Sequence, residues 1–66
     1  MRLVLNGEAR EMGRSDTVAA LLDELGLEPQ RVAVLVNDDV VPAERRAATR
    51  LQADDRVEVF TFAGGG

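Results

Sequence analysis

Apolar and polar positions follow two periods along this chain, one of two residues, typical of strands, and one of about 3.6 residues, typical of a helix. Strand-like residues 2–5 (RLVL) come first and are followed by Asn6-Gly7, a pair that favours a tight type I′ hairpin turn. Residues 8–12 supply the returning strand. The chain is therefore predicted to begin with a β-hairpin.

The helical period occupies the stretch that follows the hairpin. One apolar stripe is formed by four residues with the spacing of a helix face, namely Val18, Leu21, Leu22 and Leu25. Any of three polar residues can cap the first turn, namely Ser15, Asp16 or Thr17. Gly26 stands where a left-handed residue ends a helix, and Pro29 prevents the helix from continuing. This stretch predicts one helix with both ends marked.

Three further strands are predicted beyond the helix. Residues 31–37 (RVAVLVN) form a nearly unbroken apolar run, and residues 40–42 (VVP) are a short edge strand that a proline ends. Residues 43–51 lack a clear period, which indicates a turn or a short helical segment. The last strand alternates, with Val57, Val59 and Thr61 on one face and Glu58, Phe60 and Phe62 on the other.

These elements predict a single α+β domain. Because a two-stranded hairpin is not stable alone, the helix is expected to cover one face of a single mixed sheet. The plausible closure places the first and last strands side by side and parallel, in the middle of the sheet. This is the β-grasp (ubiquitin-like) fold, with five strands and one main helix. Residues 1–62 are predicted to form this domain, and residues 63–66 a flexible glycine tail.

The composition of this 66-residue chain lacks most of the side chains that enzymes use for catalysis. It contains no His, Cys, Tyr, Trp or Lys, and Ser15 is its only serine. The usual nucleophiles, the general base that works near neutral pH and the soft metal ligands are therefore missing. A domain of this size also has little room for a substrate pocket of about 300 Å³. The chain is predicted to be no enzyme in its own right and to bind no metal or cofactor.

Net charge and hydropathy indicate which classes of partner and which cellular location to expect. The net charge of −4 argues against nucleic acid, which requires a basic stripe. The densest basic spot, Arg45-Arg46, adjoins Glu44 and is interpreted as solvated surface of mixed sign. Two acidic pairs are interpreted as solvated turn residues rather than a cation site, namely Asp38-Asp39 and Asp54-Asp55. Without an apolar run of about 18 residues or a targeting segment, we expect a cytoplasmic protein that is monomeric when free.

The chain ends in Gly64, Gly65 and Gly66, for which two interpretations remain open. The glycines are either a frayed end, or the carboxylate of Gly66 is itself the reactive group. Phe60 and Phe62 carry a second pair of alternatives. Either one ring packs under the segment 43–50, or both form an exposed apolar patch that docks partners. Such a patch would be shared with Val4 and Leu35.

Several stretches, taken together, resemble the ThiS family, the small ubiquitin-like sulfur carriers of thiamine biosynthesis. They are the NGE hairpin and the segments TVAALLDELGL, VAVLVNDDVVP, DDRVEVFTFA and GGG, which together span essentially the whole chain. The chain departs from the family at Asp54, where Gly is frequent, at Ala43, where Arg is frequent, and at Arg46, which replaces an aromatic. These departures are interpreted as touching a turn and a surface segment. The ending VFTFAGGG lacks the prolines typical of carriers for molybdopterin synthesis, which favours the thiamine branch.

The resemblance implies a cycle of reactions on Gly66. An E1-like (ThiF-like) adenylating enzyme, using ATP and Mg²⁺, would form an acyl-adenylate, with Gly64 and Gly65 threaded into its channel. A persulfide sulfur donor would convert the adenylate into a thiocarboxylate, and a ThiG-like thiazole synthase would take the sulfur. Two alternatives remain: a carrier for tRNA thiolation, molybdopterin or cysteine synthesis, or a β-grasp binding module whose glycines are only a frayed end.

Overall fold

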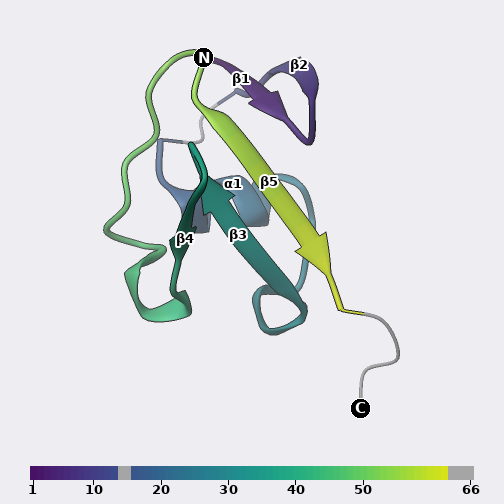
Figure 1. The fold of residues 1–66 in the computed structure, drawn as a ribbon, viewed down its shortest axis with the longest axis vertical. Coiled ribbons are helices and arrows are strands. Elements are labelled where there is room, and N and C mark those ends of the chain that lie inside the picture. Colours follow the sequence, from purple (N-terminus) through teal and green to yellow (C-terminus); the bar gives the residue numbers. More distant parts are fainter. Residues whose placement is uncertain (14–15, 63–66) are drawn as a thin grey trace.

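A five-stranded mixed sheet with one helix across one face makes up the computed structural model, which describes residues 1–13 and 16–62 (Figure 1). The strands are β1 (Arg2–Leu5), β2 (Glu8–Glu11), β3 (Val32–Val36), β4 (Asp39–Val41) and β5 (Arg56–Thr61). The helix is α1 (Val18–Glu24). Two single-turn 3₁₀ helices connect these elements, namely η1 (Pro29–Arg31) and η2 (Ala43–Arg45). No helix in the described ranges is long and apolar enough to cross a membrane.

The strand order β2-β1-β5-β3-β4 confirms the predicted β-grasp arrangement. β1 and β5 are parallel neighbours in the middle of the sheet, with Leu5 opposite Val57. β2 and β3 flank this central pair and run antiparallel to β1 and β5, and β4 extends β3 as the outer strand. β5 therefore has a neighbour on each side, which places the last strand near the centre of the sheet.

Local sequence signals set the turn and both helix ends. Asn6 and Gly7 both have positive φ, 49° and 84°, as the predicted type I′ turn requires. Thr17 is the N-cap of α1, and its Oγ1 accepts a hydrogen bond from the backbone N–H of Ala20 at 3.1 Å. Of the other two capping candidates, Asp16 does not fill this role, and Ser15 lies outside the described residues.

The C-terminal end of α1 is a Schellman motif centred on Gly26. Gly26 has a φ of 72°, and its N–H donates to the carbonyl of Asp23 at 3.0 Å. The N–H of Leu27 donates to the carbonyl of Leu22, also at 3.0 Å. This pair of hydrogen bonds defines the motif and satisfies carbonyls that the last turn would otherwise leave free. The predicted end of the helix is confirmed.

The hydrophobic core lies between α1 and one face of the sheet. Its buried apolar side chains come from the helix, from four of the strands and from two adjoining segments, and are Leu3, Leu5, Met12, Val18, Leu21, Leu22, Val32, Val34, Val41, Leu51, Val57 and Val59. Burying each side chain of this kind stabilises the fold by about 1.5–3 kcal/mol relative to leaving it in water. Without disulfides, this single layer carries most of the stability.

Arg46 corrects one prediction about the surface. Arg45 is exposed as expected, but Arg46 is only 7% exposed, so the assignment of both arginines to solvated surface is wrong for Arg46. Its Nη1 donates to the carbonyl of Pro29 and its Nη2 to the carbonyl of Val32, each at 2.7 Å. These short charge-assisted bonds offset part of the cost of removing the guanidinium from water.

Candidate functional site

The side chains of β5 alternate between the helix-covered face of the sheet and the opposite face, here called the open face. Val57 and Val59 are buried against the core. Phe60 is 51% exposed and Phe62 is 58% exposed. Packing of either ring under the segment 43–50 is therefore excluded, and the alternative of two exposed phenylalanines is confirmed. Two exposed large apolar side chains, two residues apart in the sequence, are a feature of docking surfaces.

The open face is divided along β5 into a charged half and an apolar half. Cross-strand pairing sets Ala33 beside Phe60 and Leu35 beside Glu58. On the other flank, Val4 lies beside Arg56. The two other residues predicted for the patch, Val4 and Leu35, are half-buried. Leu35 is a diagonal neighbour of Phe60 in the β3–β5 register, whereas Val4 lies beside Arg56, four residues before Phe60. Val40 of β4 is the register partner of Leu35 and is 70% exposed, so the apolar part of the open face extends from Phe60 across β3 to β4.

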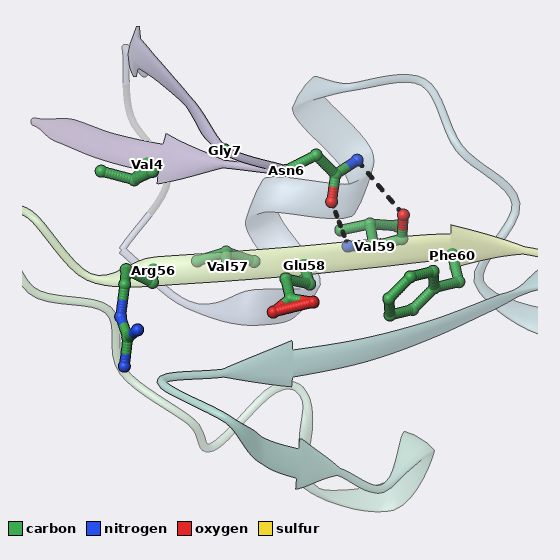
Figure 2. A pocket seen from close by; sticks show the side chains of 8 residues that line it. All are labelled: Val4, Asn6, Gly7, Arg56, Val57, Glu58, Val59 and Phe60. Carbon is green, nitrogen blue, oxygen red and sulfur yellow. Dashed lines mark hydrogen bonds between the residues drawn. The ribbon is translucent and has the colours of Figure 1, made fainter.

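A shallow hollow of about 440 Å³ lies along the β1–β5 junction and includes part of the open face (Figure 2). Figure 2 shows the Phe60 ring and the Glu58 carboxylate side by side at this hollow. Arg56, at the other end, donates from Nη2 to Oδ2 of Asp38 at 3.1 Å. An exposed ion pair of this kind contributes about 0–1 kcal/mol. Arg56 can therefore exchange Asp38 for an acidic group of a partner at little cost.

Two turn asparagines hold β5 from opposite sides. Oδ1 of Asn6 accepts from the N–H of Val59 at 2.8 Å, and Nδ2 of Asn6 donates to the carbonyl of Val59 at 3.3 Å (Figure 2). Oδ1 of Asn37 accepts from the N–H of Arg56 at 2.9 Å. Both asparagines have positive φ, 49° and 50°, which this residue type tolerates better than most. The sequence marks both positions as turns but gives no sign of these contacts with β5.

The end of β5 remains tied to the start of β3. Val32 is the register partner of Thr61, and the N–H of Phe62 donates to the carbonyl of Arg31 at 2.8 Å. The chain is therefore held in place up to Phe62. The remaining predicted site residues, Gly64, Gly65 and Gly66, lie outside the described residues.

The acidic pairs serve the turns. Asp38 and Asp54 have positive φ, 73° and 69°, and each carboxylate pairs with an arginine. Oδ2 of Asp55 accepts from the N–H of Gln52 at 2.8 Å and so closes the turn before β5. Within residues 1–13 and 16–62, no group of three or more His, Cys, Asp or Glu side chains is placed to hold a metal ion. The interpretation as turn residues holds for Asp38, Asp54 and Asp55 but is wrong for Asp39, which is the first residue of β4 and pairs with Val36.

Comparison with known proteins points to one family. A sequence model of the ThiS family matches residues 3–66. Over 100% of its length the chain is 44% identical to a Paramagnetospirillum magneticum protein named thiazole synthase, but it spans only 20% of that protein. It is 29% identical to the sulfur carrier protein ThiS of Escherichia coli, with 100% of both chains covered. The crystal structure of the thiamine biosynthesis protein ThiS from Geobacter metallireducens is 32% identical and covers 100% of both chains, with a TM-score of 0.83. The chain belongs to the ThiS family.

Proposed function

We propose that this chain is a sulfur carrier protein for thiazole formation in thiamine biosynthesis, and that its reactive group is the α-carboxylate of Gly66. The observation that carries the proposal is the end of β5, where Phe60 and Phe62 are exposed shortly before the three terminal glycines, residues 64–66. The name of the Escherichia coli relative, sulfur carrier protein ThiS, supports the same role. The chain would act as a co-substrate of partner enzymes rather than as a catalyst.

The chemistry needs a carboxylate and a leaving group. A C-terminal carboxylate is ionised at neutral pH, and its oxygen can attack the α-phosphorus of ATP bound with Mg²⁺ in an E1-like, ThiF-like adenylating enzyme. Pyrophosphate leaves, and the acyl-adenylate carries AMP as its leaving group. The terminal sulfur of a donor persulfide then displaces AMP, and a thiol cleaves the resulting S–S bond to release the thiocarboxylate.

The folded body is required because the tail binds weakly by itself. Ordering each residue costs about 1–2 kcal/mol of backbone entropy, so Gly64, Gly65 and Gly66 together oppose docking by several kcal/mol. The missing Cβ atoms allow partner backbone to approach closely. Phe60 and Phe62 supply the compensating contact, because buried aromatic anchors at an interface contribute about 2 kcal/mol or more each.

A thiazole synthase is proposed as the acceptor of the sulfur. The Paramagnetospirillum magneticum protein named thiazole synthase contains a stretch 44% identical to this chain, which makes up 20% of its length. The presence of both parts in one polypeptide supports a physical association between the carrier and a ThiG-like synthase. The free carboxylate of Gly66 would be regenerated when the sulfur is transferred.

Intact mass spectrometry tests this proposal. The chain is incubated with an adenylating enzyme, ATP, Mg²⁺ and a persulfide donor, and it should gain the mass difference between one sulfur and one oxygen. Fragmentation should place the change at Gly66. A chain lacking Gly66 and a chain extended by one alanine should both remain unmodified. Thiolation of the extended chain would contradict the proposed role of the Gly66 carboxylate.

A genetic test addresses the pathway. Deletion of the gene in its host should create a requirement for thiazole that the wild-type chain restores. Loss of thiolated tRNA or of molybdoenzyme activity, with thiazole synthesis intact, would assign the carrier to another pathway. The mass measurement and the genetic measurement therefore separate the carrier chemistry from the choice of pathway.

A further inference from the structure

Among the described residues, Arg46 is the one charged residue that is buried. Its guanidinium contacts one short segment of the chain. Nη1 and Nη2 donate to the carbonyls of Pro29 and Val32, each at 2.7 Å. Nε is buried and has no hydrogen-bond partner among the residues that the structure describes. Its own backbone carbonyl accepts from the N–H of Ala19 at 3.1 Å, in the first turn of α1. Arg46 therefore connects the start of the helix to the segment that includes η1.

Packing of the core does not by itself require a buried arginine at this position. Burying a guanidinium costs free energy, and an Nε without a partner adds to that cost. An apolar side chain of similar length would fill the same space without desolvating a charge. What an apolar side chain could not do is hold the carbonyls of Pro29 and Val32 in fixed places. The contacts that distinguish Arg46 from such a side chain are therefore those with the segment 29–32.

The segment held by Arg46 is also the one that holds the end of β5. Arg31 lies between the two carbonyls that Arg46 binds, and its own carbonyl accepts the N–H of Phe62 at 2.8 Å. Val32 is at the same time the register partner of Thr61. A continuous series of hydrogen bonds thus leads from the buried guanidinium to the last residues before the glycine segment.

We propose that Arg46 is a positioning residue for the chemistry of the Gly66 carboxylate, which it serves by fixing the point at which Phe62 leaves the sheet. The inference rests on the proposed function, because it assumes that a partner enzyme receives the tail. Residues 63–66 can span at most about 14 Å, so the location of Phe62 limits where the carboxylate can reach. A displacement of about 1 Å at a reacting group can reduce a rate by about 100-fold.

Kinetics with the carrier as the varied substrate separate positioning from general stability. A variant that is partly unfolded supplies less folded substrate, which raises the apparent KM and leaves kcat unchanged. A variant that docks through Phe60 and Phe62 but presents the tail wrongly lowers kcat and leaves KM unchanged. The two effects can therefore be told apart in one titration.

The test variant is Arg46→Met, which removes the donors while keeping much of the side-chain length. The matched control is Arg45→Met, since Arg45 is the exposed neighbour of Arg46. With the adenylating enzyme that modifies the wild-type chain, kcat of Arg46→Met should fall at least about tenfold with KM within about twofold of wild type. Exchange of the Phe62 amide hydrogen, followed by NMR, should become about tenfold faster. Arg45→Met should match the wild type in both measurements.

A wild-type kcat and a wild-type Phe62 exchange rate in Arg46→Met would overturn the inference, as would an effect confined to KM. If Arg46→Met does not fold, Arg46→Lys keeps the positive charge but not the two-point donor geometry, and it should show the same changes at smaller size. If the wild-type chain itself is never thiocarboxylated, the proposed function fails. The exchange rate of the Phe62 amide then still decides whether Arg46 holds the end of β5.

Discussion

The two faces of β5 share one backbone and nearly the same neighbours along the chain, yet their side chains meet different surroundings. On the covered face, Val57 and Val59 are enclosed by α1 and the adjacent strands. On the open face, Phe60 and Phe62 remain more than half exposed, although each is larger than either valine. A strand selected for folding alone would favour the reverse placement, because the larger apolar side chains gain most from burial.

The contrast supports the proposal that stability and partner recognition depend on opposite faces of the same strand. The covered face provides the core of a small domain, whose total stability is expected to be about 3–10 kcal/mol. The open face leaves apolar area exposed, which the proposed function assigns to contact with a partner. Substitutions on the covered face should therefore change the stability of the fold, and substitutions on the open face should change partner binding.

The largest effect is expected on the covered face, from Leu3→Ala. Leu3 is fully buried, and truncating such a side chain costs about 2–5 kcal/mol through lost burial and the cavity left behind. That loss is a large part of the total stability, so urea unfolding should shift to a much lower midpoint. Phe60→Ala is the matched control, since it removes more apolar atoms but should change stability by no more than about 0.5 kcal/mol. Equal losses in the two variants would contradict the division of the faces.

The next largest effect is expected on the open face, in partner binding. Phe60→Ala and Phe62→Ala should each weaken docking to the adenylating enzyme by about 2 kcal/mol, or roughly 30-fold in affinity. Binding can be followed by calorimetry with the unmodified chains. Glu58→Gln, on the same face but in its charged half, tests whether the apolar half is decisive, and its effect should be smaller. Unchanged affinity in both phenylalanine variants would show that the adenylating enzyme does not dock on the open face.

A smaller effect is expected from glycine at position 6, where Asn6 supports β5 without belonging to the open-face patch. Asn6→Gly retains the positive φ but loses the contacts with Val59, and it should destabilise the fold by about 1 kcal/mol. Asn6→Ala should cost about 1–2 kcal/mol more, because alanine is strained in the left-handed region. Thermal unfolding of the pair separates the two contributions. Identical melting temperatures for glycine and alanine would show that backbone strain is not significant at this turn.

The smallest effect is expected at the N-terminal end of α1, remote from the open face. Thr17→Ala removes the side-chain acceptor for the Ala20 N–H and should cost about 1 kcal/mol in unfolding free energy. Asp16→Ala, one residue earlier, should cost less than about 0.5 kcal/mol, because among residues 1–13 and 16–62 the contact of its carboxylate is an exposed ion pair with Arg50. Neither variant should alter the affinity for a partner enzyme. A larger loss of unfolding free energy in Asp16→Ala than in Thr17→Ala would show that Asp16, rather than Thr17, caps the helix.

The features that could be predicted from the sequence have local causes. Asn6-Gly7 signals its turn because both residues must adopt positive φ, and Gly26 ends α1 for the same reason. The period-two alternation of β5 separates the valines from the phenylalanines without any knowledge of their neighbours. From these signals follow the order of elements and most of the core, whereas the exposure of Phe60 is only one of two alternatives that the sequence leaves open.

The features that were missed depend on contacts between distant parts of the chain. Arg46 is buried because carbonyls 14 and 17 residues earlier accept its hydrogen bonds, and a backbone carbonyl leaves no mark in the sequence. Asn6 reaches Val59, 53 residues later, in the same manner. The sequence also indicates that Val4 and Leu35 share the face of Phe60, but not that Leu35 is a diagonal neighbour of Phe60 while Val4 lies beside Arg56.

The most direct test of the division between the faces is an NMR titration of the isotope-labelled chain with the adenylating enzyme. Backbone amides of residues 58–62 and of the adjoining part of β3 should shift or broaden first. Amides of α1, on the covered side, should remain at their free positions until the open face is saturated. Perturbations that begin on α1 and leave residues 58–62 unchanged would contradict the claim that the open face is the docking surface.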